Sequence, residues 1–221
     1  MVPGAYLPGA IFYEATRKYL FAMLCDRRTI LLLAASLSVA GGSARGETMS
    51  QKSAIIDDLS REPPLSAIGS RWQLFTDQVM GGVSNGTMVR ETVAGRPAIR
   101  MRGNVSLENN GGFVQIAIDL SLDGKAVDAS PWRGIELDVF GNSEEYSIHL
   151  RTEDLTRPWQ SYRQSFRADR QWRTIPFRFQ DFVPYRTETA LDTRRLRRIG
   201  VVAIGRAFSA DLAIGGLRYL A

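Results

Sequence analysis

From Trp72 onward the chain alternates hydrophobic and polar residues with a period of two, which is the pattern of half-buried β-strands. Gly, Asn, Asp or Pro interrupts this pattern every eight to twelve residues. Short alternating segments separated by turn residues are typical of β-sandwiches and barrels. The pattern therefore predicts an all-β fold. The clearest alternating runs are residues 113–120, 135–140, 146–151 and 174–179.

Three local signals predict connections between these segments. Asn85-Gly86 predicts a tight hairpin turn, because both central residues of such a turn need positive φ. Residues 54–59 are compatible with one helical turn or an initial strand, and residues 189–195 with a short helical turn. We expect residues 47–70, which include Pro63-Pro64, to be a lead-in segment and residues 71–221 to form the β-domain.

Residues 1–46 are interpreted as a targeting region. Residues 29–40 form an apolar run of twelve residues that follows Arg27 and Arg28 and precedes small residues. About 20 apolar residues are needed to span a membrane, so the run predicts a secretory signal peptide and no stable membrane span after cleavage. The paired arginines resemble a twin-arginine export signal, which predicts a periplasmic or secreted protein. A mitochondrial transit peptide is the alternative, and Met23 is the expected translation start.

Charge and cysteine content exclude several classes of function. The formal net charge is +5, and the basic residues include the cluster Arg194, Arg195, Arg197 and Arg198, which we interpret as a solvated turn. No nucleic-acid-reading motif accompanies this charge, so no nucleic-acid partner is predicted. The only cysteine, Cys25, precedes the expected cleavage site, which excludes disulfides from the mature protein.

Two glycine-rich stretches, residues 72–86 and 106–113, are the main candidates for a binding site. One interpretation is that they are ordinary strand connections in which Asp77 and Asn110 accept backbone N–H groups. The other is a paired-loop site for a ligand or partner, because adjacent glycines allow a close backbone approach. A phosphate-binding loop is excluded, since no Gly-Lys-Ser/Thr follows. The candidate residues are Asp77, Met80, Gly81, Gly82, Ser84, Asn109, Asn110, Gly111 and Gly112.

These same stretches carry a family resemblance. Trp-x4-Asp-x-Val-Met-Gly-Gly-x-Ser-x-Gly at residues 72–86 and GNVSLENNGGF at 103–113 resemble the motifs of the complex I intermediate-associated protein 30 family. The resemblance extends to Ala221 and implies a jelly-roll β-sandwich like that of galactose-binding domains. It also implies a relation to chaperones that assemble respiratory complex I in mitochondria. It transfers no catalytic residue, and an exported protein would lie on the opposite side of the membrane from that assembly.

The sequence predicts no catalytic centre, no cofactor and no metal site. His149 is the only histidine, and the mature chain has no cysteine for a nucleophile–base pair. Glu136 and Asp138 share one face of a predicted strand, as a glycosidase pair would, or they are ion-pair partners for Arg133, Arg151 or Arg163. A loop Ca²⁺ bound by Asp77 or Asn110 has no supporting motif. We therefore interpret the protein as non-enzymatic.

Two binding functions remain open. The first is a protein-binding or assembly-factor module with a partner that is related to a respiratory complex. The second is a carbohydrate- or small-ligand-binding sandwich, in which Trp132 or Trp159 lines one exposed concave face together with His149 and Arg151. The other two tryptophans, Trp72 and Trp172, are predicted to lie at strand positions in the core.

Overall fold

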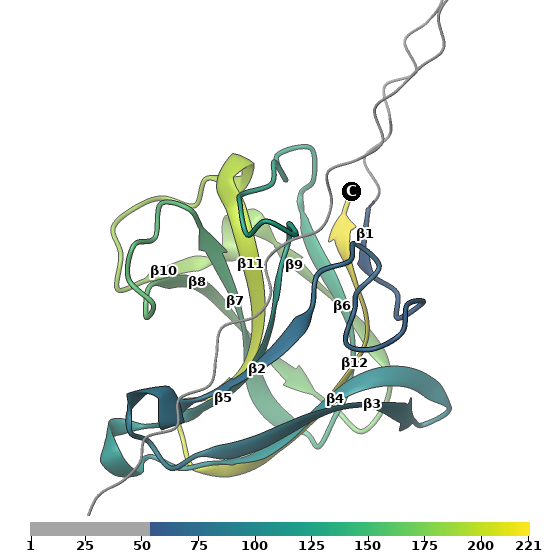
Figure 1. Ribbon diagram of the computed structural model, residues 1–221, viewed down its shortest axis with the longest axis vertical. Coiled ribbons are helices and arrows are strands. Elements are labelled where there is room, and N and C mark those ends of the chain that lie inside the picture. Colours follow the sequence, from purple (N-terminus) through teal and green to yellow (C-terminus); the bar gives the residue numbers. More distant parts are fainter. Residues whose placement is uncertain (1–53) are drawn as a thin grey trace, which may run out of the picture. The chain divides into compact units, whose positions relative to one another are not determined.

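The computed structural model describes residues 54–221, which form two six-stranded antiparallel sheets (Figure 1). The first sheet has the order β3 (Asn85–Val93), β4 (Arg96–Val105), β12 (Phe208–Leu220), β6 (Gly134–Gly141) and β9 (Arg173–Arg178), with β1 (Ile55–Asp57) paired to β12. The second has the order β10 (Val183–Tyr185), β8 (Ser161–Ala168), β7 (Glu144–Thr152), β11 (Leu196–Ile204), β5 (Phe113–Asp119) and β2 (Trp72–Thr76).

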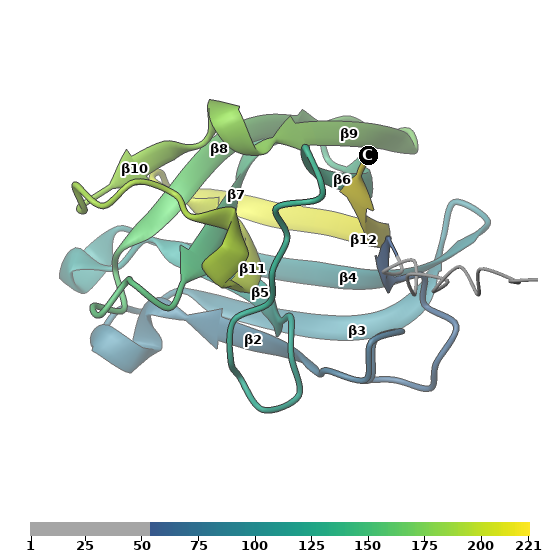
Figure 2. The same cartoon turned by 90° about the horizontal axis from the view of Figure 1, so that it is seen from above.

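Four short 3-10 helices lie in the connections, and Figure 2 shows the same elements from above. They are η1 (Asp77–Met80), η2 (Glu108–Asn110), η3 (Phe179–Asp181) and η4 (Thr193–Arg195). No helix among residues 54–221 is long and apolar enough to cross a membrane. The predicted targeting region, with its signal peptide and Cys25, lies outside the described residues.

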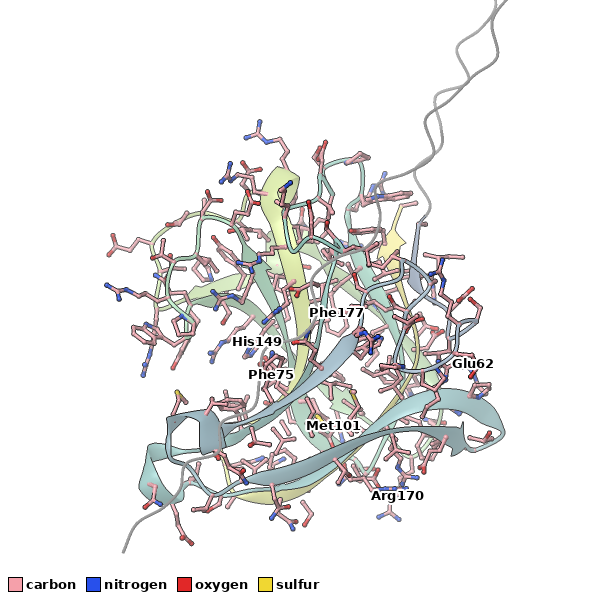
Figure 3. The ribbon with its side chains drawn as sticks, viewed as in Figure 1. Glu62, Phe75, Met101, His149, Arg170 and Phe177 are labelled. Carbon is pink, nitrogen blue, oxygen red and sulfur yellow. The ribbon has the colours of Figure 1, made fainter. Side chains whose placement is uncertain are left out.

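The core lies between the two sheets and is built by the predicted alternation. Ile135 and Leu137 of β6 are fully buried, and so are Ile148 and Leu150 of β7. Alternate residues of a strand point to opposite faces, so each strand presents one apolar side to the other sheet. Met101 and Phe177, labelled in Figure 3, belong to the same buried cluster. The all-β prediction and the jelly-roll sandwich are confirmed.

The predicted hairpin turn at Asn85-Gly86 is wrong, because both residues open β3. Gly86 lies opposite Gly103 of β4, and a Cβ on Gly103 would come within 2.3 Å of the Asn85 carbonyl oxygen. Here glycine allows two strands to approach closely. The turn between β3 and β4 is Ala94-Gly95, with φ of 45° and 79°. Positive φ at both central residues suits a hairpin turn, but alanine rarely adopts it, so the sequence signal was absent.

The remaining local predictions are resolved by strand pairing. Residues 54–59 contain β1, which brings part of the lead-in segment into the first sheet, where the buried Asp57 accepts a 2.7 Å hydrogen bond from Trp72 Nε1. The helical turn predicted within 189–195 is η4. The arginine cluster is not one solvated turn, because Arg197 and Arg198 belong to β11.

Candidate functional site

The two glycine-rich stretches meet at a buried carboxylate (Figure 1 shows η1 and η2 close together at one end of the sheets). Asp77 is fully buried and accepts hydrogen bonds from the backbone N–H and hydroxyl of Ser84, the former at 2.9 Å. It also accepts N–H bonds from Gly112 at 2.5 Å and Phe113 at 3.3 Å. Ser84 Oγ accepts from the Ser106 N–H. We call Asp77, Ser84 and Gly112, with Gly82 and Gly111 beside them, the clamp.

The clamp accounts for two of the glycines in the motif. A Cβ on Gly82 would lie 2.3 Å from Asp77 Cγ, and one on Gly111 would lie 2.4 Å from Asp77 Oδ2. Burial by itself raises the pKa of Asp77, but the hydrogen bonds from Ser84 and Gly112 outweigh it, so the net pKa is lowered. The predicted acceptor role of Asp77 is therefore observed, and its carboxylate is directed to the protein's own donors.

Four apolar side chains in the two glycine-rich stretches are exposed to solvent. Val79 is 73% exposed and Met80 is 60% exposed, and Leu107 and Val83 are also exposed. Val79 and Met80 belong to η1, while Leu107 precedes η2 in the opposite stretch, next to Gly112. We call these four residues the apolar cluster. Among the predicted site residues, Met80, Gly81 and Asn109 are exposed near it, and Gly81 has φ of 87°.

A second candidate surface is the outer face of the second sheet, the face directed away from the first sheet. Strand pairing aligns its side chains in rows. One row runs from Gln73 through Ala117, Gly200, His149 and Arg163 to Val183. The next runs from Phe75 through Gln115, Val202 and Ser147 to Ser165. Ala117, Gly200 and Ser147 are the small residues of these two rows.

His149 is a buried polar residue of this face, as are Ser147 and Ser161. It is 8% exposed, and its Nε2 has no hydrogen-bond partner. Burial, together with the positive charge of Arg163 on the next strand, lowers the pKa of His149 to about 3. The imidazole is therefore neutral at physiological pH and carries one N–H donor. In Figure 3, His149 and Phe75 are labelled close to each other in projection.

Two arginines flank His149 without a carboxylate partner among the described residues. Arg163, opposite His149, donates its Nε to Ser161 Oγ at 2.8 Å and stacks on Tyr185 with its Cζ 3.4 Å from the ring centroid. Arg151 donates to the carbonyl oxygens of Pro158 at 2.6 Å and Gln160 at 3.1 Å. Burial lowers the pKa of both arginines. Arginine stays protonated even when its pKa is lowered, so both side chains keep their charge on this face.

A groove of about 480 Å³ opens on this face over β7, β8 and β11. Its volume is in the range of small-ligand sites. It can offer a ligand hydroxyl, guanidinium and carboxylate groups as well as apolar surface. The lining residues are Glu145, Tyr146, Ser147, Arg163, Gln164, Ser165, Asp181, Val183 and Ile204.

The structure brings together only part of the predicted carbohydrate surface. His149 and Arg151 lie on the same face of β7, as expected, and Trp159 is 49% exposed in the loop whose carbonyls Arg151 binds. Trp132 does not join them, because it stacks on Tyr219 of β12 with the ring centroids 5.6 Å apart. The proline next to Trp132 did not predict its exposure, because its aromatic partner Tyr219 belongs to a strand that is distant in the sequence.

Two tryptophans were predicted to lie at strand positions in the core, and they differ in burial. Trp72 of β2 is buried, as predicted. Trp172 precedes β9 and is half-buried, with its Nε1 donating to the Val93 carbonyl at 3.0 Å. Its ring also lies 4.6 Å from the Arg96 guanidinium carbon. Trp172 therefore packs against the first sheet outside the main core.

The carboxylate pair on β6 forms ion pairs, with arginines other than those predicted. Glu136 bonds Arg218 Nε at 2.7 Å, and Asp138 bonds Arg218 Nη1 at 3.1 Å. Asp138 also accepts from the Thr174 hydroxyl and lies 3.4 Å from Arg96. Burial by itself raises the pKa of Asp138, but these partners lower it overall. Within residues 54–221 no cluster of three His, Cys, Asp or Glu side chains could hold a metal ion.

Sequence reasoning missed the groove and Arg163. No motif marks them, because the outer face is assembled from residues of six strands that are far apart in the sequence. The only signal was the small residues that interrupt hydrophobic strands, Gly200 and Ser147, where alternation alone would allow large side chains. A Cβ on Gly200 would lie 2.8 Å from Gln115 Nε2, so the Gln115 side chain lies over Gly200.

Comparison with known proteins agrees with the fold. The model of the family "Complex I intermediate-associated protein 30 (CIA30)" matches residues 66–214. Among solved structures, the family 11 carbohydrate-binding module of the cellulosomal cellulase Lic26A-Cel5E of Clostridium thermocellum is 14% identical with a TM-score of 0.59, over 76% of this chain and 94% of that chain. The same organism's module in complex with a β-1,3-1,4-mixed-linked tetrasaccharide is 13% identical with a TM-score of 0.60, over 76% and 95%. No curated protein matches the chain.

Proposed function

The chain belongs to the complex I intermediate-associated protein 30 family, and we propose that it is a non-catalytic module that binds an oligosaccharide on the outer face of the second sheet. The observation that carries this proposal is the groove beside Arg163, a cation that no carboxylate within residues 54–221 pairs with. A concave site that combines apolar surface with a few polar groups is typical of small-ligand binding.

The chemistry of the groove fits a sugar. Saccharide hydroxyls both donate and accept, and the groove presents the exposed Ser165 hydroxyl for either role, while the Ser147 hydroxyl already donates to the Gln164 carbonyl and can only accept. Arg163 stacked on Tyr185 provides a planar donor that is already ordered, which reduces the entropic cost of binding. The likeness to modules that bind carbohydrate, one of them in complex with a tetrasaccharide, supports this choice of ligand class.

We expect Ser165→Trp to abolish binding by filling the groove. Ser165 is exposed on β8 and lines the groove, so a larger side chain there should leave the core intact. Thr87→Trp, at an exposed position of β3 in the other sheet, is the matched control. An oligosaccharide array identifies the ligand, and calorimetry then measures its affinity. The proposal predicts at least a tenfold loss for Ser165→Trp and none for Thr87→Trp; equal affinities, or no binding on the array, would refute it.

A second candidate function, docking of a protein partner, is favoured by the apolar cluster. Val79 and Met80 are large apolar side chains exposed in the most characteristic motif of the chain. Exposed apolar groups that are gathered at one place mark interaction sites, and Met is enriched in interfaces. A respiratory-complex subunit or assembly intermediate would be the partner that the family name indicates.

We expect Met80→Asp to lose such a partner. The substitution places a charge in the cluster at a side chain that is 60% exposed and is not part of the clamp, so the melting temperature should stay unchanged. Leu122→Asp is the control, because Leu122 is 77% exposed and outside the cluster. The measurement is cross-linking in membrane fractions followed by identification of the captured protein. A partner that is captured equally well by both variants would argue against docking at the cluster.

A further inference from the structure

We propose that the ligand of the outer face is an acidic oligosaccharide, and that its carboxylate or sulfate group binds at Arg163. This inference rests on the proposed function and adds the charge class of the ligand. It follows from the distribution of charged and unpartnered groups along the rows of the second sheet.

Arg163 supplies the strongest feature for an anion. Arg163 lies on the outer face opposite His149 and is one of the residues that line the groove. Among residues 54–221 no carboxylate lies within ion-pair distance of it, while Tyr185 holds its plane in place. A planar guanidinium binds a carboxylate or sulfate through paired N–H donors, and such charge-assisted bonds are stronger than neutral ones. Arg163 is thus a fixed cation whose natural counter-ion is missing from the protein.

His149 lies next to this cation and carries no charge of its own. Strand pairing places His149 directly opposite Arg163 on neighbouring strands. Burial lowers the pKa of His149 to about 3, so its imidazole is neutral, and its Nε2 is enclosed by the protein. Gln115 lies over Gly200 on the other side of His149, so Arg163 is the cation of this row that faces the groove.

Arg151 adds positive potential to this face, and no carboxylate within residues 54–221 neutralises it. Its guanidinium donates to the carbonyl oxygens of Leu155, Pro158 and Gln160, and these neutral groups leave the charge uncompensated. Burial, then the neighbouring Arg198 and Arg197, lowers the pKa of Arg151. The charges acting on it are therefore of the same sign, which favours the arrival of an anion.

The acidic groups of this face set the orientation of the ligand. Asp119 is already paired with Arg198 through bonds of 2.7 and 2.9 Å. Glu145 precedes His149 by four residues on β7, so it lies roughly 13 Å farther along the strand. Asp181 also lines the groove. We infer that the charged group binds at the Arg163 end, and that uncharged, hydroxyl-bearing sugar lies toward Glu145.

Calorimetry with matched oligosaccharides tests the charge class. The probes are tetragalacturonate, its fully methyl-esterified form, a sulfated galactan tetrasaccharide and inorganic sulfate. We expect one of the two acidic tetrasaccharides to bind at least tenfold more tightly than the ester. Arg163→Gln should weaken this binding about tenfold to a hundredfold, since a hydrogen bond to a charged group is lost. Arg163→Lys should retain part of it, and Arg173→Gln, on β9 in the first sheet, should change nothing.

Each alternative outcome contradicts a defined part of the inference. If the ester, or a neutral oligosaccharide from the array, binds best and Ser165→Trp still blocks it, the ligand is neutral and only the charge class is refuted. If inorganic sulfate binds as tightly as the oligosaccharides, the face is an anion site without saccharide recognition, and the inference is refuted. If no oligosaccharide binds, the proposed function is refuted with it. Equal affinities of the wild type and Arg163→Gln would place the anion elsewhere.

Discussion

Replacing Asp77 with alanine is expected to lower the free energy of unfolding by about 3 kcal/mol or more. The substitution removes the acceptor of the Ser84, Gly112 and Phe113 N–H groups in a buried site. Each buried donor left without a partner costs about 1–3 kcal/mol. Urea denaturation followed by tryptophan fluorescence measures the change. The loss should be present at neutral pH, because the pKa of Asp77 is lowered and the carboxylate is ionised there.

Asp123→Ala is the matched control for Asp77→Ala. Asp123 also accepts a local backbone N–H, from Lys125, but it is exposed, so water replaces the lost acceptor. We expect no appreciable change in the free energy of unfolding for this variant. A loss below about 1 kcal/mol for Asp77→Ala would mean that the clamp does not hold the two glycine-rich stretches together.

Lowering the pH from 7 to 5 is expected to cost about 2 kcal/mol of stability through His149 alone. Burial lowers the pKa of His149 to about 3 in the folded protein, whereas the unfolded chain takes up the proton near pH 6.5. Below pH 6.5 the unfolded state therefore binds more protons than the folded state, and stability falls by about 1.4 kcal/mol per pH unit until the pH reaches about 3. Denaturation curves at several pH values measure this slope.

His149→Gln is the control for this pH dependence. His149 is the only histidine of the chain, and carboxylates titrate mainly below pH 5, so the variant should lose most of the slope between pH 7 and 5. Any remaining slope reports the carboxylates, and the difference between the two proteins isolates His149. Parallel pH profiles for the wild type and His149→Gln would show that the imidazole is hydrated in solution and that the face is more open than described.

The fold was predictable from the sequence because burial in a sandwich follows the alternation of residues. Ile135, Leu137 and Ile148 are core residues for the reason that their positions indicated. The errors came from residues whose role depends on a distant partner. Asn85-Gly86 has the composition of a turn, but Gly86 is needed because β4 approaches it at Gly103. The Ala94-Gly95 turn has no comparable signal.

The candidate site was predictable in its motifs but not in its geometry. Asp77 was expected to accept backbone N–H groups, and it does, which gives the glycine-rich motif a structural role within the protein. His149 and Arg151 were paired correctly because they are two residues apart on one strand. Arg163 could not be found in this way, since its position opposite His149 depends on the register between β7 and β8.

The central claim is that the outer face of the second sheet binds the ligand. Its most direct test is an NMR titration of the isotope-labelled protein with the oligosaccharide identified on the array. The account predicts that the largest amide shifts fall on β7, β8 and β11, around Ser147, His149, Arg163 and Ser165. Shifts that cluster instead on η1 and η2 around Met80, or that spread evenly over both sheets, would contradict it.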